Sequence, residues 1–159
     1  MTAKIIDGNA IAREVRSEWK QHVDALRARG VVPGLAVVLV GEDPASRVYV
    51  ARKTKACADV GVHSETHAFA HDASEDTVLA CIRALNANAA IHGILVQLPL
   101  PPAFNTRRLI EAIAPDKDVD GFNLYNVGAL VADHTVFPPC TPYGVLCLLR
   151  FPVARLTPS

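Results

Sequence analysis

The run GLAVVLV at residues 34–40 is the feature that most restricts the fold of this chain. It is short, continuously apolar, rich in valine and bounded by glycines, which predicts a β-strand buried on both faces. A second run, IHGILVQL at 91–98, has the same character and ends before Pro99, which cannot donate a hydrogen bond to a sheet. Strands of this kind are typical of parallel sheets that are covered by helices.

Helical patterns separate these strands. Apolar residues recur with helical spacing from Ile11 to Leu26, which predicts an amphipathic helix that ends at Gly30. Further helices are predicted over 46–60, ending at Gly61; over 73–86, with Asp72 and Glu75 as a capping box; over 106–114, capped by Asn105; over 126–132; and from Thr141 as N-cap and Pro142 as first helical residue to Pro152. Weaker strands are predicted over 4–6 and 62–69. The alternation predicts an α/β fold, with an open, mostly parallel sheet, helices on both faces and repeated βα units.

Length and charge indicate one globular domain. The chain has 159 residues, half of them hydrophobic, and its 16 basic residues balance 16 acidic ones. This composition disfavours both disorder and a nucleic-acid partner. The sequence contains no apolar stretch of membrane-spanning length and no secretory signal, so we expect no membrane partner and a cytoplasmic location. Four cysteines without a CxxC pair are expected to be reduced and mostly buried.

Parallel sheets bind their ligands beyond the carboxyl ends of the strands. The segments expected at that edge are GEDPAS at 41–46, QLPLPP at 97–102 and PDKDVDGF at 115–122. These segments are rich in polar and proline residues, and a domain of this size can bring them together.

Tyr49 and Lys53 are four residues apart on the predicted helix after GEDPAS, so they share one helix face. Tyr49 could stack on a planar ligand, and Lys53 could move a proton or stabilise negative charge. The alternative interpretation is a lysine on an exposed helix face.

Two other polar positions invite a functional interpretation. Gln97 interrupts an apolar strand before Pro99, where it either serves a ligand or caps the proline turn. Asp118 and Asp120 flank Val119 ahead of Gly121, and a carboxylate there could accept paired N–H bonds from a ligand. Alternatively, both aspartates are solvated or form an Asx-turn.

No metal site is predicted. His63, His67 and His71 recur every four residues, but in a strand and loop this spacing is too long for shared coordination. The sequence also lacks GxSxG, HExxH and GxGxxG motifs and any phosphate-binding loop.

Four segments together resemble a known family. They are VGEDPASRVYVARKTKACADVG at 40–61, GILVQLPLP at 93–101, PDKDVDGF at 115–122 and PCTPYGV at 139–145. In this order they resemble the amino-terminal catalytic domain of the bifunctional methylenetetrahydrofolate dehydrogenase/methenyltetrahydrofolate cyclohydrolase family. The resemblance covers about residues 1–148, which we expect to form a folate-binding catalytic domain.

The resemblance implies roles for individual residues. Tyr49 would stack against the folate, Lys53 would be the catalytic lysine, Gln97 its hydrogen-bonding partner and Asp120 the carboxylate that holds the pterin. Val96, Leu98 and Pro99 would line the substrate pocket. The implied partners are tetrahydrofolate derivatives and, by family, a second copy in a homodimer.

Residues 149–159 depart from the family, whose members continue into a Rossmann domain that binds NADP. We expect this divergent tail to leave the chain without a cofactor site, as a truncated or frame-shifted member or an excised domain. The expected function is therefore one-carbon folate chemistry, with cyclohydrolase activity more plausible than dehydrogenase activity. The alternatives are a non-catalytic folate-binding remnant or interaction module and, less favoured, an unrelated α/β domain.

Overall fold

The computed structural model describes residues 5–154, in which helices and strands alternate. The elements are α1 (Gly8–Ala28), β1 (Gly34–Val40), α2 (Pro44–Val60), β2 (His63–Phe69), α3 (Glu75–Ala87), β3 (Gly93–Val96), α4 (Thr106–Glu111), α5 (Leu124–Val131) and α6 (Cys140–Ala154). The strands form one parallel sheet in the order β2-β1-β3. The predicted α/β class is confirmed.

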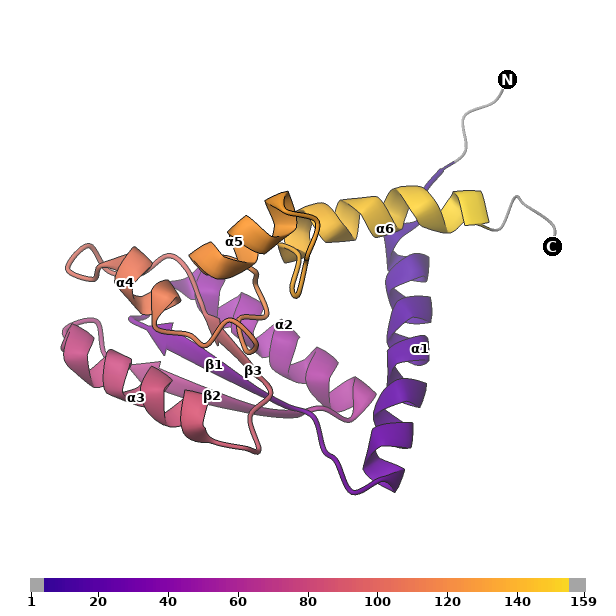
Figure 1. Cartoon of the computed structure of the whole chain (residues 1–159). Coiled ribbons are helices and arrows are strands. Elements are labelled where there is room, and N and C mark those ends of the chain that lie inside the picture. The colour runs from indigo at the N-terminus through magenta and orange to yellow at the C-terminus, as the bar shows by residue number, and fades with distance from the viewer. Residues whose placement is uncertain (1–4, 155–159) are drawn as a thin grey trace.

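The central strand β1 is buried on both faces, as its apolar run predicts. Ala36 and Val38 are 0% exposed and pack into the main core with α3, whereas Val37, also 0% exposed, packs toward Val50 of α2. Side chains that alternate along the strand therefore fill two cores, with α3 over one face and α2 over the other (Figure 1).

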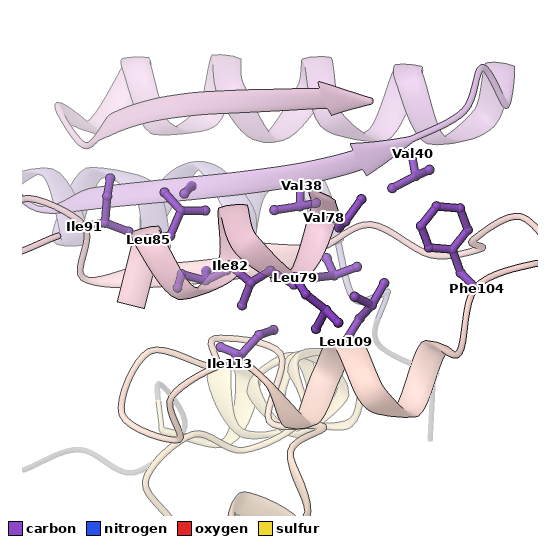
Figure 2. Packing of buried hydrophobic residues seen from close by; sticks show 13 residues of the cluster. Val38, Val40, Val78, Leu79, Ile82, Leu85, Ile91, Phe104, Leu109 and Ile113 are labelled. Atoms are coloured by element: carbon purple, nitrogen blue, oxygen red, sulfur yellow. The ribbon is translucent and has the colours of Figure 1, made fainter. Parts of the chain in front are cut away.

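The larger core is closed by the segments that follow β3. Its members from β1 and β3 meet Val78, Leu79, Ile82 and Leu85 of α3, and Phe104, Leu109 and Ile113 complete it (Figure 2). These contacts pack the segment around α4 against the sheet. The chain after α4 then returns to the edge of the sheet where β1 and β3 end.

The start of the chain and the start of α3 differ from the sequence predictions. Of the strand predicted over 4–6, Lys4 lies outside the described residues, and Ile5 and Ile6 belong to no strand and are exposed, because the chain enters α1 directly. The N-cap of α3 is Ser74, whose hydroxyl accepts from the Thr77 amide at 3.2 Å, so the predicted capping box is wrong. The helix starts later than predicted, and the side chain of Glu75 instead turns to α4.

The predicted ends of α6 are also wrong. The helix begins at Cys140, before Thr141, and continues through Pro152 to Ala154. Pro152 stands in the last turn, where it removes one amide donor while the flanking backbone stays helical. The predicted boundary between residues 148 and 149 therefore falls inside a continuous helix.

The cysteines are less buried than predicted. None of them forms a disulfide, Cys57, Cys81 and Cys147 are half-buried, and Cys140 is exposed. Among residues 5–154, no helix has the length and apolar character needed to cross a membrane.

Candidate active site

The candidate site lies at the carboxyl ends of β1 and β3, where the loop after β1 leads into α2. Asp43 caps α2 by accepting a 2.7 Å hydrogen bond from the Ser46 amide, and Pro44 occupies the first turn, which needs no amide donor. This cap fixes the start of the helix that carries Tyr49 and Lys53.

Gln97 follows β3 directly and continues its pairing with β1, because its amide donates to the Val38 carbonyl at 2.9 Å. Its side-chain Oε1 accepts a hydrogen bond from Lys53 Nζ at 3.1 Å, and its Nε2 donates to the Leu98 carbonyl at 2.7 Å. An inverted amide would place an NH₂ group against the lysine, so the two contacts define the orientation of the side chain. Gln97 therefore stabilises the proline turn through one hydrogen bond and contacts Lys53 through another.

A cavity of about 240 Å³ adjoins this pair. Residues from α2, from the end of β3, from the 118–122 turn and from the start of α6 surround it. They are Lys53, Val96, Gln97, Leu98, Asp120, Phe122, Pro139, Cys140, Thr141 and Pro142. The structure thus brings together five of the predicted site residues.

The two aspartates of the KDVDGF segment face different surroundings. Asp120 lines the cavity, whereas Asp118 is 1% exposed and its Oδ2 accepts hydrogen bonds from the Asn123 amide and from Asn126 Nδ2. Gly121, with a φ of 67°, closes the turn that contains both aspartates, because its amide donates to the Asp118 carbonyl. Asp120 is therefore the carboxylate available to a ligand, and Asp118 is structural.

Burial sets the electrostatics of Asp120. Loss of hydration raises the pKa of this carboxyl, the charge of Lys53 opposes that shift, and the charge of Asp118 adds to it. The pKa of the Cys140 thiol is also raised, first by desolvation and then by the Asp120 carboxylate. Although Cys140 is exposed as a residue, its Sγ lies 3.3 Å from the Val119 carbonyl oxygen, so the sulfur itself is partly withdrawn from water.

Two predicted substrate-binding residues do not line this cavity. Tyr49 lies one turn before Lys53 on α2 and is 53% exposed, and Pro99 is also exposed. Their predicted contacts with a folate ring stay predictions.

The sequence predictions missed several other residues that line the cavity. Phe122 follows the aspartate turn, Pro139 precedes α6, and Cys140, Thr141 and Pro142 begin that helix. The PCTPYGV motif was the available signal, but Cys140 was interpreted as a small core residue and Thr141 as a helix cap.

The histidines of β2 interact with a carboxylate instead of with each other. His67 Nε2 lies 2.8 Å from Glu65 Oε1, and His63 Nε2 lies 3.8 Å from Glu65 Oε2. Within the described part of the chain, no group of His, Cys, Asp or Glu residues is arranged to hold a metal ion.

Comparisons with known proteins identify the family of this chain. The family model of the tetrahydrofolate dehydrogenase/cyclohydrolase catalytic domain matches residues 6–120. The bifunctional protein FolD of Nitrosospira multiformis is 55% identical over 150 residues, which are 94% of this chain and 52% of that protein. The chain thus spans about half the length of the curated relatives it matches.

Solved structures show the same fold. The bifunctional FolD enzyme of Campylobacter jejuni superposes with a TM-score of 0.90 at 40% identity, over 92% of this chain and 52% of that one. The methylenetetrahydrofolate dehydrogenase-cyclohydrolase of Trypanosoma brucei, solved with NADP and an inhibitor, gives a TM-score of 0.89 at 34% identity, over 94% and 52%. From the extent of the family match, the chain belongs to the tetrahydrofolate dehydrogenase/cyclohydrolase family.

Proposed function

We propose that the chain binds a tetrahydrofolate derivative in the cavity beside Lys53 and hydrolyses 5,10-methenyltetrahydrofolate to 10-formyltetrahydrofolate. The observation that carries the proposal is the 3.1 Å contact between Lys53 Nζ and Gln97 Oε1, with Asp120 lining the same cavity. The amine, the amide and the carboxylate offer one proton carrier, one group that orients it and one anion for ligand N–H groups.

In the proposed reaction, water adds to the carbon of the cationic N–C–N bridge. Lys53 relays one proton away from that water while the C–O bond forms. The bond from this carbon to N5 then breaks, the formyl C=O forms, and N5 gains a proton. One of the two water protons thus ends on N5 and the other is released, so atoms and charge balance.

The remaining roles concern the position of the ring. Asp120 would accept paired N–H bonds from the pterin, and Val96 and Leu98 would contact its faces and edges. Tyr49 would stack against the folate, and Pro99 would line the pterin pocket. Fixed orientation of the bridge carbon against Lys53 would supply much of the rate.

The dehydrogenase reaction that the family resemblance implies uses NADP, and the described residues do not fit this cofactor. The turn after β1 carries Glu42 and Asp43, and the turn after β2 carries Asp72. A dinucleotide phosphate binds to free backbone amides and positive charge at a helix N-terminus, but these turns carry carboxylates. The first turn of α3 is also acidic, with Glu75 and Asp76. We therefore assign no hydride transfer to residues 5–154.

A second candidate function is folate binding without turnover. Phe122, Cys140, Thr141 and Pro142 line the cavity and are nevertheless exposed, so water reaches the site from that side. Poor exclusion of water weakens the electrostatic and positional contributions to catalysis more than it weakens binding.

One experiment separates these candidates. Calorimetric titration with tetrahydrofolate measures binding, and loss of methenyltetrahydrofolate absorbance, above the buffer rate, measures hydrolysis. Binding with hydrolysis supports the first function, and binding without hydrolysis supports the second. Absence of binding contradicts both.

We also propose a cytoplasmic location, since none of the cysteines is paired within residues 5–154, as expected in a reducing compartment. Association with a second copy stays a prediction of the family resemblance.

A further inference from the structure

Asp118 is a buried carboxylate that the proposed chemistry does not use. It is 1% exposed, and the ion pairs found among the described residues do not include it. A buried carboxylate is costly unless hydrogen bonds replace its hydration. Here the Asn123 amide donates to its Oδ2 at 2.8 Å, and Asn126 Nδ2 donates to the same atom at 3.0 Å.

These two asparagines extend the network on both sides. Asn123 Nδ2 donates to the Ile113 carbonyl at 3.0 Å, and Asn126 Nδ2 also donates to the Pro115 carbonyl at 2.9 Å. Asn123 is the N-cap of α5, so the carboxylate of Asp118 connects the start of that helix to the segment after α4.

Asp118 is also tied to the sheet through the backbone. It forms an isolated parallel bridge with Ile94 of β3, whose amide donates to the Lys117 carbonyl at 2.7 Å. Its own carbonyl accepts from the Gly121 amide at 3.2 Å, which closes the turn around Asp120. The residue that lines the cavity is therefore held by a residue fixed to both the sheet and α5.

We propose that Asp118 is a positioning residue of the candidate site, whose hydrogen bonds hold the 118–123 turn so that Asp120 faces the cavity and whose charge acts on that carboxylate. The importance of this role for folate binding rests on the proposed function, but the role itself can be measured in the ligand-free protein.

Within residues 5–154, the groups that act on Asp120 come from the elements around it. Lys53 reaches it from α2, Cys140 from α6, and Asp118 from its own turn. After burial and the opposing charge of Lys53, the negative charge of Asp118 is the next contribution, and it raises the pKa of Asp120. Removal of that charge should therefore lower the pKa of Asp120.

The first test is an NMR titration of the Asp120 side-chain carboxyl carbon in Asp118→Asn and in Asp116→Asn. Asp116 lies in the same segment and is exposed, which makes it a matched control. We expect the Asp120 midpoint to move to lower pH in Asp118→Asn and to stay unchanged in Asp116→Asn. A midpoint that is unchanged or higher in Asp118→Asn would overturn the electrostatic part of the proposal.

The second test measures hydrogen exchange of the Asn123 amide, which donates to Asp118. Asn126→Ala keeps the carboxylate and removes one of its two donors, and it remains available if Asp118→Asn does not fold. We expect exchange at Asn123 to be faster by roughly tenfold in either variant, with the Asp120 midpoint kept in Asn126→Ala. Unchanged exchange in Asn126→Ala would contradict the proposed network.

Calorimetry with tetrahydrofolate connects these results to the site. We expect weaker affinity in Asp118→Asn than in Asp116→Asn, and equal affinities would contradict a positioning role. If the unaltered protein binds no tetrahydrofolate, the proposed function fails, whereas the titration and exchange results still decide whether Asp118 positions Asp120.

Discussion

Lys53 and Gln97 lie 44 residues apart in the chain and meet through a 3.1 Å hydrogen bond between Nζ and Oε1. The contact arises because β1 and β3 are neighbouring parallel strands, so the helix after β1 and the residue after β3 meet at one edge of the sheet. Since Gln97 Nε2 is engaged by the Leu98 carbonyl, the amide presents its oxygen to the amine.

Replacement of Lys53 by methionine should abolish hydrolysis of methenyltetrahydrofolate. Methionine keeps an unbranched side chain of similar length but cannot carry a proton, so we expect a loss of roughly 10² to 10⁴-fold. Lys55→Met is the matched control on the same helix, because Lys55 is exposed and pairs along the helix surface with Asp59. Equal rates in the two variants, followed by absorbance, would remove Lys53 from the mechanism.

Replacement of Gln97 by methionine should reduce both stability and activity. Gln97 is 9% exposed, and its loss leaves Lys53 and the Leu98 carbonyl without this partner, at a cost of about 1 to 3 kcal/mol. Urea unfolding measures the free energy, with Gln21→Met on the exposed surface of α1 as the control. We expect the control to stay within about 0.5 kcal/mol of the unaltered protein.

Two glycine-to-alanine changes should have opposite effects on stability. Gly121 has a φ of 67°, and a Cβ there would lie 2.5 Å from the Phe137 carbonyl oxygen, so Gly121→Ala should destabilise by about 2 to 4 kcal/mol. Gly128 lies within α5 with no atom near its would-be Cβ, so Gly128→Ala should stabilise by about 0.5 to 1 kcal/mol. Thermal and urea unfolding check both signs, and stability gained in Gly121→Ala would show that the turn is not needed.

The fold was predictable from sequence where periodicity is strong. The apolar run of β1 and the helical spacing of α3 determine which faces are buried, so these elements follow from local patterns. The helical spacing also predicts α1 itself, but of its apolar stripe only Val23 is buried, and Trp19 is 60% exposed. Element ends were less predictable, because they depend on contacts distant in sequence. Glu75 looked like part of a capping box, but it accepts from the amide of Asn105, which no local pattern reveals.

The site was predictable only in part for the same reason. Chain order places Lys53 and Gln97 at one edge of the sheet, but it does not show which of two neighbouring aspartates faces the cavity. That choice depends on the asparagines that bind Asp118, which lie five and eight residues further along the chain. The contribution of the start of α6 to the cavity was missed, because the position of this helix depends on the path of the chain after α5, which no local pattern shows.

Glu75 should contribute to acid unfolding. The Asn105 amide, followed by the side chain of Arg108, lowers its pKa below the ordinary value of 4.5. Because the folded pKa is lower than the unfolded pKa, this contribution to stability is present above the unfolded pKa and is lost as the pH falls through the folded pKa. We expect Glu75→Gln to lose less unfolding free energy than the unaltered protein between about pH 5 and pH 3.

The control for this prediction is Asp76→Asn, at an acidic residue that is 84% exposed and lies 3.5 Å from the same arginine. Its pH profile should match that of the unaltered protein. Urea unfolding at several pH values measures both variants, and an equal loss in Glu75→Gln and the unaltered protein would contradict the assignment.

Asp120 should show the opposite pH dependence, because burial raises its pKa above the ordinary value of 3.8. The unfolded chain gives up this proton more readily than the folded one, so ionisation of Asp120 destabilises the fold as the pH rises from the unfolded to the folded pKa. Asp120→Asn removes that cost. We therefore expect the variant to gain unfolding free energy relative to the unaltered protein at neutral pH and to show little gain below the unfolded pKa.

The same change should weaken tetrahydrofolate binding, because an amide cannot replace the charged acceptor of paired N–H bonds. Asp116→Asn, at an exposed residue of the same segment, should change neither property. Urea unfolding across this pH range and calorimetry with tetrahydrofolate measure the two effects. If the variant is more stable at neutral pH and binds tetrahydrofolate more weakly, Asp120 is a carboxylate that lowers the stability of the fold but contributes to ligand binding. If the variant binds tetrahydrofolate as before, Asp120 is not part of the folate site.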